Sequence, residues 1–98
     1  MFSYNIFKQG DNVLLAICDY KILDKTFESG QLTITVSEFY KGKECGEKTA
    51  LSLVNKSTII NAVGNEIVKL LIDRNIVDDS NVLKIGGILH AQVVLMKG

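Results

Sequence analysis

His90 is the only histidine of the chain, and it stands two residues before Gln92 in the apolar run at the end of the sequence. Side chains two apart in a strand point to the same face, so these two polar groups should lie side by side. A polar group inside such a run needs a hydrogen-bond partner or a ligand. Two interpretations stay open. Either His90 binds a ligand or moves protons while Gln92 orients it, or His90 is a structural histidine at a strand end.

A second candidate site is the segment Phe39-Tyr40-Lys41-Gly42-Lys43, in which two aromatic residues stand beside two cations. Aromatic rings stack on unpaired bases and lysines hold phosphates, so this composition is typical of loops that bind single-stranded nucleic acid. The alternative is that one ring anchors the loop to the core while the lysines are only solvated. The chain has 11 basic and 11 acidic side chains, so an RNA partner would need a local patch of this kind.

Lys25 is a further candidate binding residue, because Lys25-Thr26 resembles the end of a phosphate-binding loop. The glycine-rich run that such a loop needs is missing between Asp19 and Asp24, so a nucleotide site is not expected and the pair should close a turn. Glu66 completes a different hypothesis, in which His90, Gln92 and this acid converge in the pocket of a small enzyme or ligand-binding protein.

Cys45 and His90 could pair as nucleophile and base, but the loop around Cys45 carries no signature of a nucleophile. A single histidine excludes a multi-histidine metal site, and no cofactor is expected. Cys18 ends an apolar run and should be buried, whereas Cys45 lies in a charged loop and should be accessible. Two thiols placed in this way indicate reduced cysteines in the cytoplasm.

Length and composition favour one folded domain, because 98 residues with 47% hydrophobic and 22% charged side chains can bury one modest core. The longest apolar run, Val13 to Cys18, is far shorter than the roughly 18 residues of a membrane helix. The first residues lack a charged segment followed by an apolar one, as in a secretion signal. We therefore expect neither secretion nor a membrane partner.

The pattern of the whole sequence predicts the elements that must position these residues, and they form an α+β fold. We expect a mostly antiparallel sheet of about five strands with two hairpins, packed against one main helix and one or two short helices. Turn residues Gly10-Asp11-Asn12 and Gly86-Gly87 mark the two hairpins. The expected strands are Phe2 to Ile6, Val13 to Cys18, Leu32 to Val36, Val82 to Ile85 and Ile88 to Lys97. Val13 to Cys18 and Ala91 to Leu95 should be interior strands.

The helical segments are predicted from apolar spacing in the middle of the chain. They are a single turn between Asp19 and Phe27, a helix at Glu47 to Asn55, and a main helical region that Ser57 caps and Gly64 interrupts. Asn61 and Glu66 flank Gly64 and are expected to form a capping arrangement at this break. Asn75 should end that region in a left-handed conformation. Between the strands and the helices, Ser37 to Gly46 is expected to be an irregular loop.

Four short segments in register resemble the archaeal family called domain of unknown function 424: Leu23-Asp24-Lys25-Thr26-Phe27, Val36-Ser37-Glu38-Phe39-Tyr40, Val63-Gly64-Asn65-Glu66 and Ile85-Gly86-Gly87-Ile88-Leu89-His90-Ala91-Gln92-Val93. The similarity covers nearly the whole chain. This chain differs by Asp24 in place of Gly, Lys41-Gly42 in place of Gly-Gly, an inserted Asn65, and Leu89 in place of Pro. The last change puts a tight bend before His90 in doubt.

This resemblance implies an archaeal cytosolic protein from a family with no established activity, whose members are loosely associated with translation genes. It favours a non-enzymatic module that binds RNA, the ribosome or a translation-factor protein through the Phe39 to Lys43 loop and the His90 face. The alternatives are the enzyme or ligand-binding protein described above and a structural subunit that buries an apolar patch in a homodimer.

Overall fold

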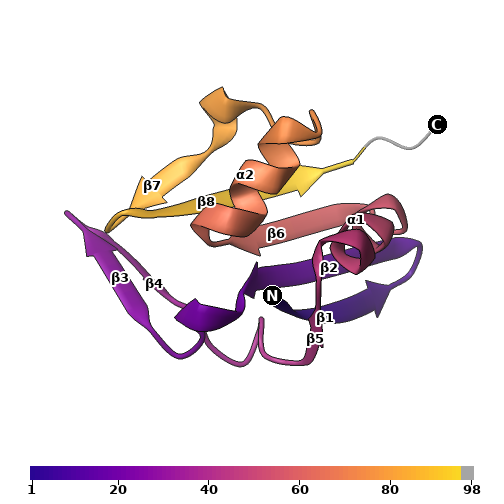
Figure 1. Cartoon of the computed structure of the whole chain (residues 1–98), viewed down its shortest axis with the longest axis horizontal. Helices are drawn as coiled ribbons and strands as arrows, with labels where there is room; N and C mark the ends of the chain where they lie inside the picture. Colours follow the sequence, from indigo (N-terminus) through magenta and orange to yellow (C-terminus); the bar gives the residue numbers. More distant parts are fainter. Residues whose placement is uncertain (96–98) are drawn as a thin grey trace.

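The computed structural model describes residues 1–95, and it contains eight strands, two α-helices and two 3₁₀ turns (Figure 1). In chain order the elements are β1 (Phe2–Gln9), β2 (Asn12–Asp19), η1 (Tyr20–Ile22), β3 (Thr26–Ser29), β4 (Leu32–Thr35), β5 (Lys43–Cys45), α1 (Glu47–Asn55), β6 (Ile59–Val63), α2 (Asn65–Asp73), η2 (Asp79–Asn81), β7 (Leu83–Ile85) and β8 (Ile88–Val94). No helix within residues 1–95 has the length and apolar character needed to cross a membrane.

Six strands form one mixed sheet in the order β5-β1-β2-β6-β8-β7, and β3 pairs with β4 in a separate two-stranded sheet. All neighbours are antiparallel except β2 and β6, which run parallel at the centre. The α+β class is confirmed, but the expected five strands are eight and the sheet is mixed. The parallel pair was missed because its partners are far apart in the sequence.

Both expected hairpins are present, and glycine makes both turns possible. Gly10 has φ 59°, and Gly86 and Gly87 have φ 56° and 85°. Two successive residues with positive φ match the twist of the flanking strands in a two-residue turn. The Gly-Gly signal therefore predicted the β7–β8 hairpin correctly.

The segment from Ile59 to Val63 is a strand, so the prediction of a helical region beginning at Ser57 was wrong here. Its backbone pairs with β2 along five residues, from Leu14 opposite Ile59 to Cys18 opposite Val63. Ser57 caps no helix; its hydroxyl donates to the carbonyl of Leu53 at the end of α1. Apolar residues on both faces of a central strand leave no clean alternation in the sequence, which made this segment look helical.

Two shorter strands were also missed. Thr26–Ser29 pairs with the predicted strand β4, and Lys43–Cys45 adds an edge strand within the expected loop. Helix α1 has the predicted bounds. The end of α2 is as expected, because Asn75 has φ 58° and the Ile76 N–H donates to the Leu71 carbonyl.

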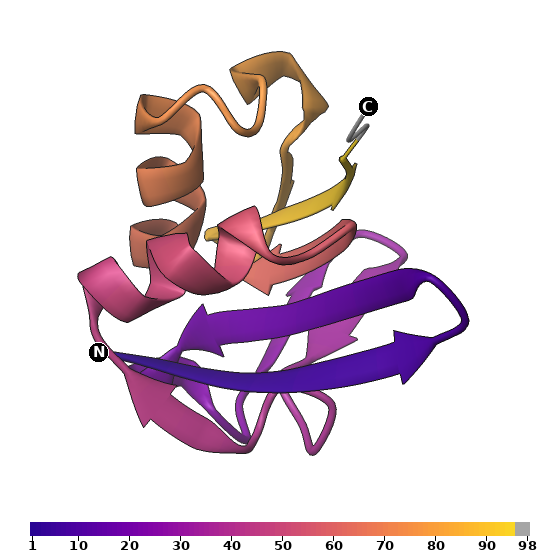
Figure 2. The same cartoon turned by 90° about the vertical axis from the view of Figure 1, so that its right-hand side faces the viewer.

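Both helices cover the same side of the six-stranded sheet, as Figure 2 shows most clearly. We call this side the helix face. Its buried residues are Leu15 and Ile17 of β2, Ile60 and Ala62 of β6, Ala91 of β8, Ala50 and Val54 of α1, and Ile67, Val68 and Leu71 of α2. Helix spacing brings each helical apolar stripe onto the sheet, and this burial is the main stabilising term of the fold.

The opposite side of the sheet carries a second, smaller core and no helix. There Ala16, Cys18 and Val63 pack under Ile22, Val36 and Tyr40. β2 is an interior strand with both faces buried, as predicted. β8 is also interior in its pairing, but on this second side Gln92 and Val94 are exposed. The predicted end of this strand at Lys97 lies outside the described residues.

Candidate functional site

The side of the sheet without helices, which we call the open face, presents its side chains in three rows set by the strand register. Residues directly opposite one another across a strand pair share a face. The first row is Phe7, Leu14, Ile59 and Val94; the second is Asn5, Ala16, Asn61 and Gln92; the third is Ser3, Cys18, Val63, His90 and Leu83.

The loop from Glu38 to Gly42 lies over the second row and is held there by Asn5 and Ser3. The Asn5 side-chain amide donates to three loop carbonyls, those of Glu38, Phe39 and Lys41, at 2.8 to 3.3 Å. The Ser3 hydroxyl donates to the Tyr40 carbonyl at 2.8 Å and accepts from the Gly42 N–H at 3.1 Å. This part of the expected irregular loop is therefore held as a strap across part of the open face.

Gly42 is required for this close approach. A Cβ atom at this position would lie 2.3 Å from the Tyr4 carbonyl oxygen and 2.8 Å from the Asn5 side-chain carbon. A backbone oxygen in a sheet cannot move aside, so only glycine lets the strap return to the edge of β1.

The two aromatic residues of the strap have different environments. The ring of Phe39 stacks on that of Phe7 with centroids 5.2 Å apart and an interplanar angle of 7°. Phe39 and Phe7 remain 36% and 43% exposed, whereas Tyr40 is buried. Tyr40 is therefore the ring that anchors the loop, and Phe39 with Phe7 forms a stacked pair open to solvent.

Tyr40 begins a hydrogen-bonded chain on the open face. Its hydroxyl donates to Asn61 Oδ1 at 2.6 Å, and His90 Nε2 lies 3.2 Å from the same oxygen. Burial, and to a smaller extent the neighbouring Cys18 thiol, raises the pKa of Tyr40 to about 12, so this hydroxyl keeps its proton. Burial also lowers the pKa of His90 below its ordinary value of 6.5, which favours the neutral imidazole.

These hydrogen bonds determine how the His90 imidazole and the Asn61 amide are oriented. A carbonyl oxygen only accepts, so His90 must carry its proton on Nε2 and leave Nδ1 bare. Within residues 1–95, His90 Nδ1 and Asn61 Nδ2 make no hydrogen bond, and no buried side-chain nitrogen or oxygen is without a partner. Both atoms therefore reach solvent, beside the exposed Gln92 directly across from Asn61.

The structure separates the lysines that the sequence grouped. Lys41 lies on the strap and its ammonium is 3.3 Å from the Asp24 carboxylate, an exposed ion pair. Lys43 is opposite Tyr4 in the β1–β5 pairing, and Tyr4 packs against the helix-face core, so Lys43 belongs to the other side of the sheet. Lys25 is exposed, and its backbone N–H donates to the Ile22 carbonyl in the turn between η1 and β3, while its carbonyl accepts the N–H of Val36, which follows β4.

Glu66 does not join His90 and Gln92. It lies in the first turn of α2 on the helix side, where its carboxylate is 3.6 Å from the Lys21 ammonium. Its backbone N–H is bound to Asp19 at the end of β2, and its carboxylate pairs with Lys21 of η1 and not with His90 or Gln92. The three residues of the enzyme hypothesis are thus not brought together.

A polar residue that the sequence did not single out, Asp19, holds the start of α2. Its carboxylate accepts the backbone N–H groups of Glu66 and Ile67, both at 2.9 Å, and it is 1% exposed. Burial raises the pKa of Asp19, although the two N–H donors act in the opposite direction. Its position directly after a buried strand was the available signal, because a helix N-terminus needs acceptors for its free N–H groups.

Gly64 allows this capping. It has φ 127°, and a Cβ atom there would lie 2.4 Å from the Asp19 carboxyl carbon. The next residue, Asn65, fastens the helix to the start of β8 by accepting the Leu89 N–H at 3.0 Å and donating to the Gly87 carbonyl at 3.3 Å. The predicted capping arrangement of Asn61 and Glu66 around Gly64 was therefore wrong; Asp19 and Asn65 have that role.

Both cysteines are free thiols and both are buried. This confirms the expectation for Cys18 but corrects that for Cys45, which is 7% exposed. Cys45 ends β5 opposite Phe2, and that register points its side chain into the helix-face core. Burial raises the pKa of both thiols, that of Cys18 to about 12. A nucleophilic pair of Cys45 with His90 is not formed, since they belong to opposite faces.

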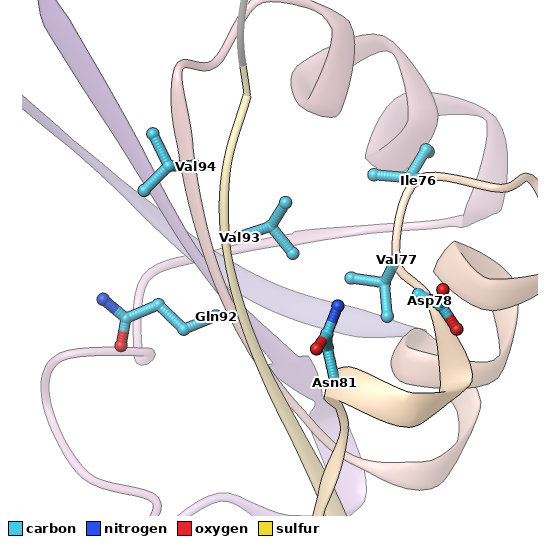
Figure 3. A pocket seen from close by; sticks show the side chains of 7 residues that line it. All are labelled: Ile76, Val77, Asp78, Asn81, Gln92, Val93 and Val94. Atoms are coloured by element: carbon cyan, nitrogen blue, oxygen red, sulfur yellow. The ribbon is translucent and has the colours of Figure 1, made fainter.

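A hollow of about 420 Å³ lies between β8 and the segment after α2. In Figure 3, Val93 points towards Val77 and Asn81, whereas Gln92 and Val94 point to the other side of the strand. The Asp78 carboxylate is already used, accepting the Ser80 N–H at 3.1 Å. On its strand side this hollow is therefore lined by Val93, and the Gln92 amide lies on the open face instead.

The architecture is that of a small α+β protein with two helices on one side of a mixed sheet and a strapped, partly open second side. The chain belongs to a family described as a protein of unknown function (DUF424), whose sequence model matches residues 7–96.

A solved structure with this fold is that of an uncharacterized conserved protein from Methanopyrus kandleri. It is 26% identical to the chain, covers 99% of it and 94% of its own length, and has a TM-score of 0.81. A search of curated proteins found no match.

Proposed function

We propose that this protein is a non-enzymatic binding module that holds single-stranded RNA on its open face and works with the translation machinery in the cytoplasm. The observation that supports it best is the exposed Phe7–Phe39 ring pair on the same face as three polar side chains with free hydrogen-bonding atoms. Unpaired bases need both a flat apolar surface and polar groups at their edges. The link to translation rests on the family resemblance alone.

The first row of the open face provides the apolar surface. Phe7, Leu14, Ile59 and Val94 lie on four adjacent strands, so the row extends roughly 14 Å at the spacing of a β-sheet. Val94 at its far end is 65% exposed. Phe39 rises from the strap beside this row and can cover one side of a bound base.

The electrostatic contribution to binding should be small. The net charge is zero, and the one lysine of the strap on this side, Lys41, already pairs with Asp24. Few phosphates would be neutralised, and the salt dependence of binding should therefore be shallow. Base stacking, which tolerates salt, must supply most of the affinity.

The test is a titration of a fluorescein-labelled single-stranded RNA ten-mer of mixed sequence, followed by fluorescence anisotropy. Phe39→Ala should weaken binding about tenfold, since removing one stacked ring costs about 1–3 kcal/mol. The matched control is Tyr20→Ala, because Tyr20 is a similarly exposed ring outside the open face. Absence of RNA binding by the native protein, or equal losses in both variants, would contradict the proposal.

Lys41 and Lys43 provide a second matched pair. Reversal of charge in Lys41→Glu should weaken RNA binding about threefold, whereas Lys43→Glu on the other side should have little effect. The Asp24 ion pair that Lys41→Glu breaks is exposed and contributes little to stability. A larger loss of RNA affinity in Lys43→Glu than in Lys41→Glu would contradict the proposal, because the binding surface would then lie on the helix face.

A further inference from the structure

We infer that the outer edge of β1, from Ile6 to Lys8, pairs antiparallel with the same edge of a second copy of the chain and so forms a two-fold symmetric dimer. This dimer does not require RNA. Its basis is a stretch of sheet edge whose backbone groups are unpaired and whose side chains match their own two-fold image.

Only the first half of the outer edge of β1 is covered. β5 pairs with β1 from Phe2 to Tyr4 and no further, so the later part of β1, up to Gln9, has no strand on its outer side (Figure 2). The strap that precedes β5 is bound to the Asn5 side chain over the open face and does not continue along this edge. An uncovered edge of this kind is a template for another strand.

The hairpin register determines which backbone groups point outward from this edge. Gln9 and Asn12 flank the two-residue turn and are hydrogen-bonded to each other, as in other hairpins with this turn. Backbone groups alternate in direction along an antiparallel pair, so those of Ile6 and Lys8 point away from β2. Within residues 1–95 these outward N–H and C=O groups have no hydrogen-bond partner.

One register satisfies all of these groups. A two-fold axis beside Phe7 places Ile6 opposite Lys8 of the second copy, and each such pair exchanges both of its outward hydrogen bonds. An axis beside Lys8 would instead set two lysines face to face. An axis beside Ile6 would place Lys8 of the second copy opposite Tyr4, where β5 already lies. The edge therefore selects the register centred on Phe7.

The side chains of both faces suit this register. Ile6 and Lys8 lie on the same face as Tyr4, which packs against the helix-face core, and Ile6 is 40% exposed. A lysine protects an edge when it meets another cation, but here its aliphatic stem can cover the isoleucine of the other copy. On the open face, Phe7 meets Phe7 of the second copy at a position where cross-strand side chains come closest.

A hollow at the end of β5 leaves room for the turn of the second copy. It measures about 260 Å³ and is lined by Tyr4, Asn5, Ile6 and Lys43. The Gly10-Asp11 turn directly follows β1, so in this register the turn of the second copy reaches that corner. Gly10 brings no side chain, and Asp11 brings an exposed carboxylate towards the Lys43 ammonium. Opposite charges therefore meet at both ends of the interface.

The dimer also extends the surface to which we assign RNA binding. A two-fold axis perpendicular to the sheet leaves the open faces of both copies on the same side. The first row of each copy ends at Phe7 of β1, so the two rows join into one apolar strip of twice the length. Dimer formation is nevertheless tested without RNA, so that its failure and that of the proposed function are distinguishable.

The first test is sedimentation equilibrium of the native protein and of two variants at the same position. A strand pair this short buries little area, so the native dissociation constant should lie in the micromolar range. Ile6→Lys places two cations opposite one another twice and should raise this constant about tenfold, whereas Ile6→Glu faces Lys8 and should lower it about threefold. A native protein that stays monomeric at about 1 mM, or equal constants for both variants, would overturn the dimer.

The second test traps the register with cysteine. In Phe7→Cys the two new thiols lie across the axis, roughly 4.5 Å apart between Cα atoms, and air oxidation should link them into a disulfide dimer. Gln9→Cys is the control on the same face, because its two copies would be roughly 14 Å apart and cannot be bridged. Non-reducing electrophoresis measures the linked fraction, and equal linking of the two variants would overturn this register.

Discussion

Asp19 and the pair formed by Asn61 and His90 are polar groups of the same sheet, but they differ in burial and in what remains unbonded. Both oxygens of Asp19 accept backbone N–H groups, and the residue is closed off from solvent. Asn61 accepts hydrogen bonds from both Tyr40 and His90, yet Asn61 and His90 each keep one nitrogen that is unbonded and accessible. The difference separates a polar group whose acceptors are all used within the fold from polar groups that keep a nitrogen available for the proposed ligand.

The largest expected effect is the loss of the helix cap in Asp19→Ala. The N–H groups of Glu66 and Ile67 would be left without an acceptor in a buried place, which should lower the free energy of unfolding by about 3 kcal/mol. Urea denaturation measures this value. Asp24→Ala is the control, because Asp24 is exposed and only its ion pair with Lys41 is lost. Equal stability of the two variants would show that Asp19 does not hold the fold.

Gly64→Ala should lower the free energy of unfolding by a similar amount, although it removes no polar group. A φ of 127° is a conformation that only glycine adopts readily, which costs about 1–3 kcal/mol for other residues, and the added Cβ would also meet the Asp19 carboxylate. The same urea experiment measures it, with Gly46→Ala as control, since nothing lies near a Cβ at that position and its φ is −94°. A stable Gly64→Ala protein would contradict the described start of α2.

His90→Ala should destabilise the protein by only about 1 kcal/mol. Asn61 Oδ1 keeps its bond to Tyr40, and water can replace the imidazole because the site is partly open. RNA binding, in contrast, should be lost more strongly than stability. If His90→Ala lowered the free energy of unfolding by about 3 kcal/mol and left the RNA affinity at its native value, His90 would be a structural residue like Asp19.

The two sites should also respond to pH in opposite directions. The lowered pKa of His90 means that its contribution is present above pH 6.5 and is lost as the pH falls through the pKa of the folded state. The raised pKa of Asp19 means that its contribution is present below pH 3.8 and is lost as the pH rises through the folded value. The free energy of unfolding is measured against pH for the native protein, His90→Gln and Asp19→Asn, and each difference from the native profile gives the pH dependence due to that residue. Differences that change with pH in the same direction for both variants would contradict this prediction.

The smallest expected signal concerns the thiols, one on each face. Cys18 and Cys45 are both buried with raised pKa values, so a thiol-specific reagent at pH 7.5 should label neither quickly in the native protein. Labelling should become complete in denaturant, as followed by absorbance of the released thiolate. Fast reaction of Cys45 alone would show that β5 separates from the sheet edge.

The sequence indicated the parts of the fold that depend on local chemistry and missed those that depend on distant partners. Glycine pairs and the helical stripe of α1 are readable in a few residues. The strand at Ile59–Val63 is not, because its pairing with β2 supplies the hydrogen bonds that decide against a helix. Lys43–Cys45 likewise becomes a strand only because β1 offers an edge.

The candidate site shows the same limit. His90 and Gln92 share a face as strand geometry predicted, and the Phe39–Tyr40 segment reaches that face. Asn61, which connects the two, was considered only as a possible helix cap, since its strand was taken for a helix. Glu66 and Lys43 were included because sequence position cannot tell which side of a sheet a residue occupies.

The parallel pairing of β2 with β6 has a consequence for how the chain assembles. These two strands form the middle of the sheet, yet residues 20–58 lie between them in the sequence. The β1–β2 hairpin closes over a two-residue turn and can form early, whereas the centre of the sheet must wait for a long segment to be ordered. The open face is therefore complete only after β6 has docked and has brought Asn61 beneath a tyrosine that precedes it by 21 residues.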